Sequence, residues 1–421
     1  MTMTGAARRP AYRDALGEPR FRVLFATRTV AIMADTLRML ALSVLVYGRT
    51  GSPLLASAAF AAGFLPQVAG GTLAGALADR LRPRPLIAGA YALEAVAALA
   101  LALLDLPIAA ALALVALIAC ATPVFAGATN RLVAEVLTGD AYVLGRSLMT
   151  ISAAIAQLLG LACGGIAVAV LGVRGALLAA TAAYLAAALL VRLLLPDLPP
   201  APPPASDGGA ADGTDGADGG RRRSLVKESW AGTVRLLTDP VVRPLLLAQW
   251  LPSAFCAGAE SLLVPYAAVR GFGSGTAALL LGCTVGGMLL GNLAAGRLLS
   301  PPARERLLVP LMALTGLPLL PLALGVPAPA AAALLLLAGT GLAYELGIQR
   351  PFVDALPEDG RGHAFGLLST GLMTLQGIGP LAVGALAEFV TVGPALAAAG
   401  VLILAVTALL RPALRRSVPA P

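Results

Sequence analysis

Long apolar runs, separated by short polar or Gly/Pro-rich breaks, occupy most of this chain of 421 residues. A run of roughly 20 apolar residues is long enough for a helix to cross a bilayer. Only 12% of the residues are charged, against about 25% in soluble proteins, so the chain has too few charges to cover a surface in water. The runs predict an all-α membrane protein and exclude disordered and disulfide-rich secreted classes.

The apolar runs form two groups of six, which predicts twelve transmembrane helices. The first group covers 23–47, 54–78, 85–105, 107–129, 142–171 and 174–195, and the second covers 241–268, 275–299, 305–325, 328–349, 362–387 and 391–411. We therefore expect a cytoplasmic N-terminal segment at 1–22, a six-helix bundle at 23–195, a second six-helix bundle at 241–412 and a cytoplasmic tail at 413–421.

The segment between the two groups differs in composition from both. Residues 196–223 consist mainly of Pro, Gly, Ala and Asp and end in three arginines, so they bury too little apolar surface to fold and should form a disordered cytoplasmic linker. Residues 224–240 place Val226, Trp230, Val234 and Leu237 at helical spacing. That spacing is typical of an amphipathic helix on the membrane surface, although a polar continuation of the seventh span is the alternative.

The basic residues behind the formal net charge of +8 indicate how the chain is oriented in the membrane. If the N-terminus is cytoplasmic, 25 of the 30 Lys and Arg residues fall in cytoplasmic segments, 3 in external loops and 2 within the first span. This distribution satisfies the positive-inside rule and places both termini in the cytoplasm. The basic charge is thus a topology signal, and nucleic-acid binding is not expected.

The two groups of spans also match each other in sequence. At an offset of 219 residues, Arg131 aligns with Arg350, Glu135 with Asp354, and Gln157 with Gln376. The same offset aligns Gly160 with Gly379 and Gly165 with Gly384. An offset of six spans preserves membrane orientation, so the two bundles should be parallel repeats that rock about a central site.

The loop between the second and third spans carries Gly75, Asp79, Arg80 and Arg84, with Arg82 at an intermediate position. In these residues the chain resembles the major facilitator superfamily, although that family usually has Gly where Arg82 stands. The resemblance implies that the loop closes the cytoplasmic side, with Glu135 as a partner for its arginines. We expect a cytoplasmic gate made of Gly75, Asp79, Arg80, Arg84, Arg131, Glu135, Arg350 and Asp354. The alternative is that these charges only fix the topology.

Small residues recur in the fifth and eleventh spans. Gly160 and Gly165, and Gly379, Pro380 and Gly384, are similar to an element of proton antiporters in this superfamily, except that Leu161 replaces the usual Pro. Small residues allow close helix packing, here expected between the two bundles. Together with an acidic residue in the first span, they make the chain similar to the drug-efflux and siderophore-exporter branch, which includes macrolide-efflux and enterobactin-exporter proteins.

Asp35 lies about twelve residues into the first span, roughly 18 Å at 1.5 Å per residue, and so near the membrane midplane. Ionisable residues at this depth are expensive and usually functional. Arg38, three residues on, shares its helix face. Two interpretations stay open: Asp35 exchanges protons as access alternates, or Asp35 and Arg38 form a permanent pair that holds the helix.

Other polar residues in the spans complete the candidate site. Glu260 lies in the outer part of the seventh span, the counterpart of the first, and is expected to face the cavity. Glu94 is favoured as a structural partner, and Glu345 is either a gate residue or a solvated end charge. Gln157, Gln376 and Trp250 are further candidates for lining the cavity.

Enzyme classes find no support in the sequence. The single lysine, Lys227, follows Val226, so no Walker A loop exists, and the single histidine, His363, forms no zinc motif. The four cysteines fall in apolar spans and indicate no disulfide. We expect no metal and no cofactor.

These features predict a secondary transporter that exports a small hydrophobic or amphipathic compound by proton antiport. Arginine outnumbers lysine by 29 to 1, which is typical of a GC-rich bacterial genome and favours a multi-pass protein of the bacterial cytoplasmic membrane, expected as a monomer. The expected partners are the small-molecule substrate, protons and the lipid bilayer. A proton-linked uptake transporter of the same fold and a non-transporting membrane receptor or scaffold are the alternatives.

Overall fold

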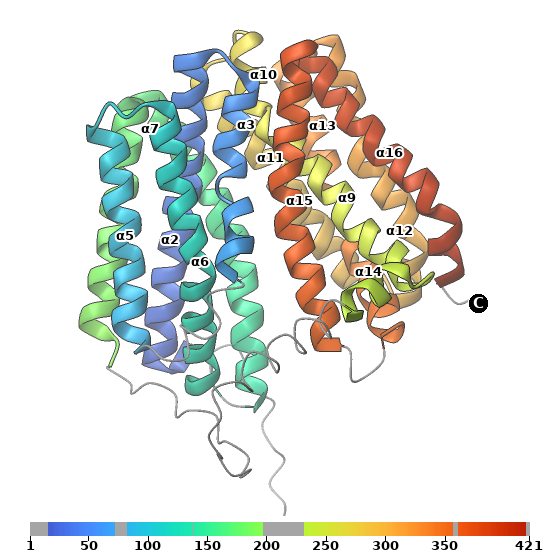
Figure 1. The fold of residues 1–421 in the computed structure, drawn as a ribbon, viewed down its shortest axis with the longest axis horizontal. Coiled ribbons are helices and arrows are strands. Elements are labelled where there is room, and N and C mark those ends of the chain that lie inside the picture. The colour runs from blue at the N-terminus through green and yellow to red at the C-terminus, as the bar shows by residue number, and fades with distance from the viewer. Residues whose placement is uncertain (1–15, 72–81, 138, 197–230, 357–360, 418–421) are drawn as a thin grey trace, which may run out of the picture. The chain divides into compact units, whose positions relative to one another are not determined.

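The computed structural model describes residues 16–71, 82–137, 139–196, 231–356 and 361–417, and in these ranges the regular secondary structure is entirely helical (Figure 1). Three of the expected gate residues, Gly75, Asp79 and Arg80, lie outside the described residues. So do most of the predicted linker and the first part of the predicted surface helix at 224–240.

In the first half of the described chain, five helices have complete bounds: α2 (Pro19–Thr50), α3 (Pro53–Ala61), α5 (Pro83–Leu103), α6 (Ile108–Val136) and α7 (Gly139–Leu194). Residues 65–71 form a further helical stretch after α3. Helix α7 contains the two predicted spans 142–171 and 174–195, joined at Gly172, whose φ of 71° breaks the helical geometry. Glycine adopts this left-handed backbone at little cost because it has no Cβ.

The second half of the chain is more interrupted. Its elements are α9 (Val242–Ser261), α10 (Leu263–Val269), α11 (Ser274–Leu298), α12 (Pro301–Gly316), the 3₁₀ helix η1 (Leu317–Leu324), α13 (Ala328–Gly341), α14 (Tyr344–Asp354), α15 (Arg361–Phe389) and α16 (Val392–Ser417). The predicted spans 241–268, 305–325 and 328–349 are each divided into two elements. Proline at 318 and 321 removes backbone donors from the second of these spans.

Twelve membrane-crossing segments follow from these helices, which confirms the prediction. Ten helical stretches in the described part of the chain are long and apolar enough to span a bilayer. Helix α7 contributes two crossings because of its break at Gly172, and α9 with α10 forms the remaining one. Leucine and valine side chains exposed on the helices, such as Val170 at 75% and Leu409 at 79%, are suited to face lipid.

The described residues form two compact units. Unit one contains the chain up to Ala41 and from Ala69 to the end of α7, whereas unit two contains Leu42–Val68 and the described chain from residue 231 onward. The core of unit one includes Phe21, Leu132 and Val191.

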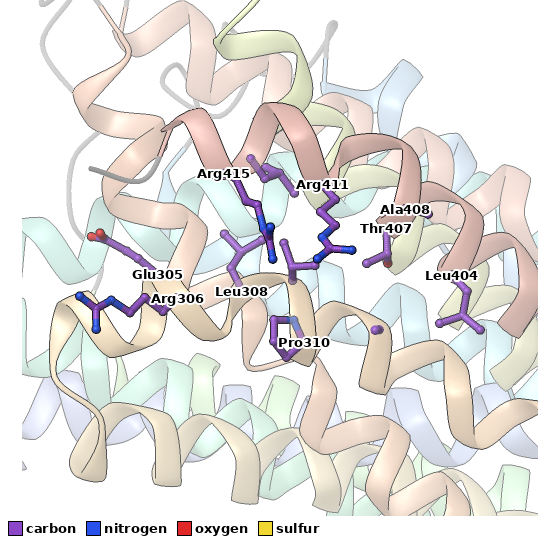
Figure 2. Close-up of a pocket in the computed structure, with 12 residues that line it drawn as sticks. Glu305, Arg306, Leu308, Pro310, Leu404, Thr407, Ala408, Arg411 and Arg415 are labelled. Carbon is purple, nitrogen blue, oxygen red and sulfur yellow. The ribbon is translucent and has the colours of Figure 1, made fainter. Parts of the chain in front are cut away.

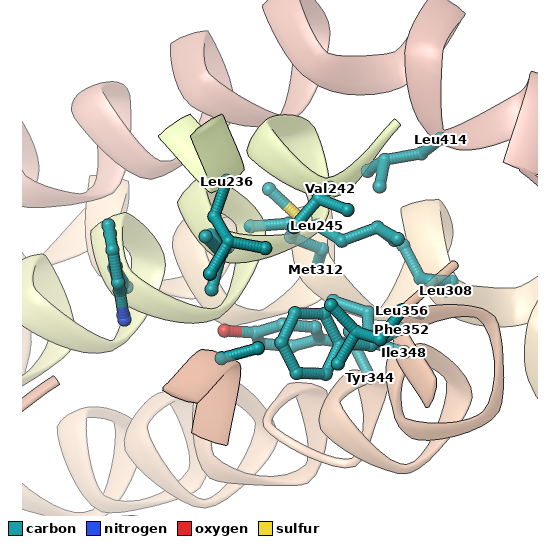
Figure 3. Packing of buried hydrophobic residues seen from close by; sticks show 14 residues of the cluster. Leu236, Val242, Leu245, Leu308, Met312, Tyr344, Ile348, Phe352, Leu356 and Leu414 are labelled. Atoms are coloured by element: carbon teal, nitrogen blue, oxygen red, sulfur yellow. The ribbon is translucent and has the colours of Figure 1, made fainter. Parts of the chain in front are cut away.

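The core of unit two packs α9, α12 and α14 around Tyr344. Leu245, Met312 and Phe352 surround this ring (Figure 3). Leu236 joins the same cluster from a short helix at 231–238, the described part of the predicted surface helix. In that helix Thr233 lies 3.0 Å from the ring nitrogen Nε2 of His363.

Candidate functional site

Helix α2 brings the charged residues of the first span together on one face. The guanidinium of Arg38 forms an ion pair with the carboxylate of Asp35, as the spacing of three residues predicts. The two side chains differ in accessibility: Arg38 is 8% exposed and Asp35 is 60% exposed. Asp35 therefore keeps one side against a buried cation and the other open.

A second carboxylate shares the same arginine. Glu94, on α5, places Oε2 at 3.4 Å from Nη2 of Arg38 and is 16% exposed. The hydroxyl of Tyr184, on α7, donates to Oδ1 of Asp35 at 3.4 Å. Glu94 thus contacts Arg38 as a structural partner would, and Tyr184 is a member of the site that sequence reasoning missed. We call Asp35, Arg38, Glu94 and Tyr184 the charged cluster.

The charged cluster borders a cavity of about 220 Å³ inside unit one. Helices α2, α5, α6 and α7 line it with Asp35, Glu94, Tyr91 and Tyr184, and with apolar side chains that include Ile32, Ile87 and Phe125. Pockets for drug-sized ligands usually measure about 300–1,000 Å³. The cavity is therefore large enough for water or for one substituent of a substrate, and too small for a whole drug-sized molecule.

Arg28, which the sequence analysis did not single out, also lines this cavity. Its Nε is buried and has no hydrogen-bond partner among the described residues. Its spacing of seven residues from Asp35, about two helical turns, was the signal that could have placed both residues on one face.

The charged cluster carries one negative charge in excess when both carboxylates are ionised. Arg38 balances only one of Asp35 and Glu94, so uptake of a single proton or a single cation makes the cluster neutral. Asp35 is the more accessible carboxylate of the two. Because Arg38 keeps a second partner in Glu94, it need not be left as an unpaired charge when Asp35 is neutralised, a state that is costly inside a membrane protein.

The polar candidates of unit two are more dispersed. Glu260 on α9 is partly buried, and its side chain makes no hydrogen bond or ion pair with another described residue. Glu345 lies in the first turn of α14, where the helix dipole favours a negative charge. Gln376 on α15 donates to Oγ of Ser253 at 3.1 Å.

The remaining two cavity candidates are placed differently. Trp250 is only 7% exposed and donates from its indole nitrogen to the carbonyl of Leu368 at 2.9 Å, so in this conformation it packs α9 against α15. Gln157 on α7 is half-buried.

Four of the expected gate residues within the described chain form ion pairs on their own helices. Arg131 pairs with Glu135 on α6 at 2.7 Å, so Glu135 has a partner on its own helix. At the matching position of the repeat, Arg350 pairs with Asp354 on α14 at 3.6 Å. The two ion pairs have the same spacing and lie at the ends of corresponding helices. Arg84 donates to the carbonyl of Arg192 and thereby joins the start of α5 to the end of α7.

The glycines of the repeat allow close helix packing. A Cβ on Gly160 would lie 2.9 Å from the carbonyl oxygen of Met33 on α2, and one on Gly379 would lie 2.1 Å from that of Ala254 on α9. The first contact lies within the first half of the sequence and the second within the second half. A Cβ on Gly384 would lie 2.6 Å from Cβ of Ser57 on α3, and this contact joins residues from the two halves of the sequence. Gly165 and Pro380 are buried.

Comparison with known proteins places these features in a family context. Residues 24–353 match the family model of the Major Facilitator Superfamily. No protein of curated function matches the sequence significantly.

Solved structures show the same fold at low sequence identity. A bacterial homologue of the human lysosomal transporter Spinster, crystallised inward-facing and unoccupied, is 14% identical, with a TM-score of 0.63 and 98% of each chain covered. A POT family transporter in complex with 5-aminolevulinic acid is 10% identical, with a TM-score of 0.69 over 95% of this chain and 96% of that one.

Proposed function

Because the chain belongs to the major facilitator superfamily of secondary transporters, we propose that it exports a small hydrophobic or amphipathic compound across the bacterial cytoplasmic membrane in exchange for protons. Transporters of this family bind small-molecule substrates and couple their movement to ions in membranes. The direction, the coupling ion and the cargo class are the parts that we propose.

The observation that best supports proton coupling is the exposed carboxylate of Asp35 beside the buried guanidinium of Arg38. A proton that reaches Asp35 removes one partner of Arg38 and weakens the tie between these side chains. Arg38 then depends on Glu94, which is on another helix. Binding and release of a proton at Asp35 therefore change the contacts of α2, a helix of the type that rocks during alternating access.

The lining of the cavity supports a hydrophobic or amphipathic cargo. Most of the accessible wall is apolar, with Ala31, Ile32 and Phe125 among its side chains. Polar side chains, including Thr129 and Tyr91 outside the charged cluster, line the remainder, and a mixed wall of this kind suits an amphipathic molecule. An apolar substituent of a larger molecule fits such a cavity.

The drug-efflux and siderophore-exporter branch is the most suitable assignment within the family. Asp35 in the first span and the matched glycines Gly160 and Gly379 support it. We also place the cytoplasmic gate at the two repeat-related ion pairs, Arg131 with Glu135 and Arg350 with Asp354.

The experiment is transport into everted membrane vesicles, whose outer surface is the cytoplasmic face. Radiolabelled tetraphenylphosphonium serves as the amphipathic probe, together with a panel of apolar drugs. We expect accumulation when the vesicle interior is acidic, and loss of accumulation when a protonophore dissipates the gradient. Vesicles that lack the protein are the control.

Two results would favour the alternatives. If intact cells accumulate the probe and Asp35→Asn abolishes this accumulation, the protein is an uptake transporter and the export hypothesis is wrong. A receptor or scaffold would be favoured by two findings together. No compound of the panel would cause a proton flux, and neutralising Asp35 and Asp79 would leave the cellular phenotype of the protein unchanged.

A further inference from the structure

A groove of about 570 Å³ runs between α12 and α16 in unit two and shares no residue with the charged cluster (Figure 2). Its volume falls within the range of about 300–1,000 Å³ that is usual for small-molecule sites. The two helices run in opposite directions, so the start of α12 and the end of α16 lie at the same end of the groove. The charge count of the sequence places this end at the cytoplasmic face.

The groove is charged at that end and apolar beyond it. Arg411 and Arg415 extend from α16 toward α12 (Figure 2), and Arg306 lies near the start of α12. Farther along, the wall consists of side chains that include Leu404, Ala408 and Ala313. Arg411 and Leu404 are seven residues apart, so the apolar part extends about 10 Å along α16 at 1.5 Å per residue.

Within the described chain, no acidic residue pairs with Arg411 or Arg415 of the groove. Arg411 and Arg415 are exposed, and neither makes a hydrogen bond or ion pair with another residue in the part of the chain that the structure describes. The acidic residue of the groove, Glu305, lies 3.9 Å from Arg350 and extends away from the two arginines of α16 in Figure 2. Two like charges four residues apart on a helix repel each other, and an anion between them would remove this repulsion.

Arg304, one residue before Glu305, provides a contrast. Its guanidinium donates to the carbonyls of Ala295, Leu299 and Gly296 at the end of α11, at 2.7 to 3.1 Å. At this end of unit two, the guanidinium of Arg304 therefore has its hydrogen-bond partners within the protein. Arg411 and Arg415 remain available for a ligand.

We propose that this groove binds an anionic phospholipid of the cytoplasmic leaflet. The phosphate lies between Arg411 and Arg415, and one acyl chain follows the apolar wall toward Leu404. Basic pockets between transmembrane helices on the cytoplasmic side recognise anionic headgroups, and the membrane supplies this ligand continuously. A free phosphate ion would use the arginines alone and would leave the apolar wall without an occupant.

Native mass spectrometry of the purified full-length protein tests the site. The delipidated protein is titrated separately with phosphatidylglycerol, phosphatidylcholine and inorganic phosphate. We expect phosphatidylglycerol to be retained at least about tenfold better than phosphatidylcholine, since each arginine near an anionic lipid contributes roughly a factor of five. The R411Q/R415Q variant should lose this preference.

Two further variants separate the possible causes. R243Q/R297Q removes the same charge from exposed arginines outside the groove, and it should bind like the wild type. Ala408→Phe keeps both arginines and fills the apolar wall from an exposed position, and it should lose phosphatidylglycerol.

Three results would overturn the proposal. The first is equal retention of phosphatidylglycerol and phosphatidylcholine by the wild type. The second is unchanged retention by R411Q/R415Q, which would mean that these arginines only orient the end of α16. The third is phosphate binding as strong as lipid binding and unaffected by Ala408→Phe, which would identify a free anion as the ligand.

Discussion

Replacing Arg38 by Met should destabilise the protein mainly through Glu94. Arg38 is the single cation that contacts both carboxylates of the charged cluster in the described chain. Methionine keeps an unbranched apolar side chain at the position and removes the charge. The two carboxylates should respond differently, because Glu94 is 16% exposed whereas Asp35 is 60% exposed.

The size of the effect follows from this difference. Removing one partner of a buried ion pair costs about 3–5 kcal/mol, whereas an exposed pair contributes about 0–1 kcal/mol. We therefore expect Arg38→Met to lower the free energy of unfolding by about 3 kcal/mol, nearly all of it from Glu94. The double variant R38M/E94Q should recover about 2 kcal/mol of this loss, because no buried charge is left without a partner.

Unfolding by sodium dodecyl sulfate in mixed micelles, followed by circular dichroism, measures these differences. R38M/D35N is the matched control, and it should recover less than about 1 kcal/mol because water already solvates Asp35. The reasoning is refuted if R38M/D35N recovers as much stability as R38M/E94Q. It is also refuted if Arg38→Met changes the stability by less than about 0.5 kcal/mol, the range of an ordinary surface substitution.

Two further predictions use the same unfolding measurement. Glu388 on α15 accepts hydrogen bonds from Oγ of Ser52 and from the backbone N–H of Leu54 at 3.1 Å, so Glu388→Ala should cost about 1 kcal/mol as a lost helix cap; a cost no larger than that of Glu18→Ala would contradict this. A Cβ on Gly339 would lie 2.0 Å from the carbonyl oxygen of Thr284, whereas one on Gly282 would meet nothing within 4 Å. Gly339→Ala should therefore destabilise by about 1–3 kcal/mol and Gly282→Ala should stabilise by up to about 1 kcal/mol, and equal effects would show that the close packing of α11 and α13 is unimportant.

The membrane fold could be predicted from the sequence because the bilayer imposes a length on each apolar run. The twelve spans and the break near Gly172 follow from run length and composition alone. The repeat could also be detected from the sequence, because residue types that are rare in this chain align between the two halves. Arg131 with Glu135 and Arg350 with Asp354 form equivalent ion pairs on corresponding helices.

The breaks within the later spans could not be predicted, because they depend on packing between helices. The run at 328–349 is apolar on both sides of the break, so composition does not distinguish the end of α13 from its interior. The run at 305–325 looked continuous for the same reason, although its prolines were a local signal for the change to a 3₁₀ helix.

The candidate site was accessible from sequence only on its own helix. Asp35 and Arg38 could be paired by their spacing, and Arg28 could have been added by the same argument. Glu94 and Tyr184 reach the cluster from α5 and α7, and Tyr184 stands 149 residues from Asp35. Sequence separation of this size carries no information about contact. Trp250 shows the converse, since an amphipathic side chain in a cavity-lining span turned out to be buried against α15.

The central claim is that Asp35 couples transport to protons, and comparison of two transport modes in proteoliposomes tests it most directly. Gradient-driven accumulation of labelled tetraphenylphosphonium requires proton exchange, whereas counterflow of labelled against unlabelled probe requires only alternating access. Glu18→Gln, which likewise converts a carboxylate to an amide but lies directly before α2, is the control and should support both modes. We predict that Asp35→Asn abolishes gradient-driven accumulation and preserves counterflow. Accumulation at the wild-type rate by Asp35→Asn, or loss of both modes in this variant, would contradict a proton-coupling role for Asp35.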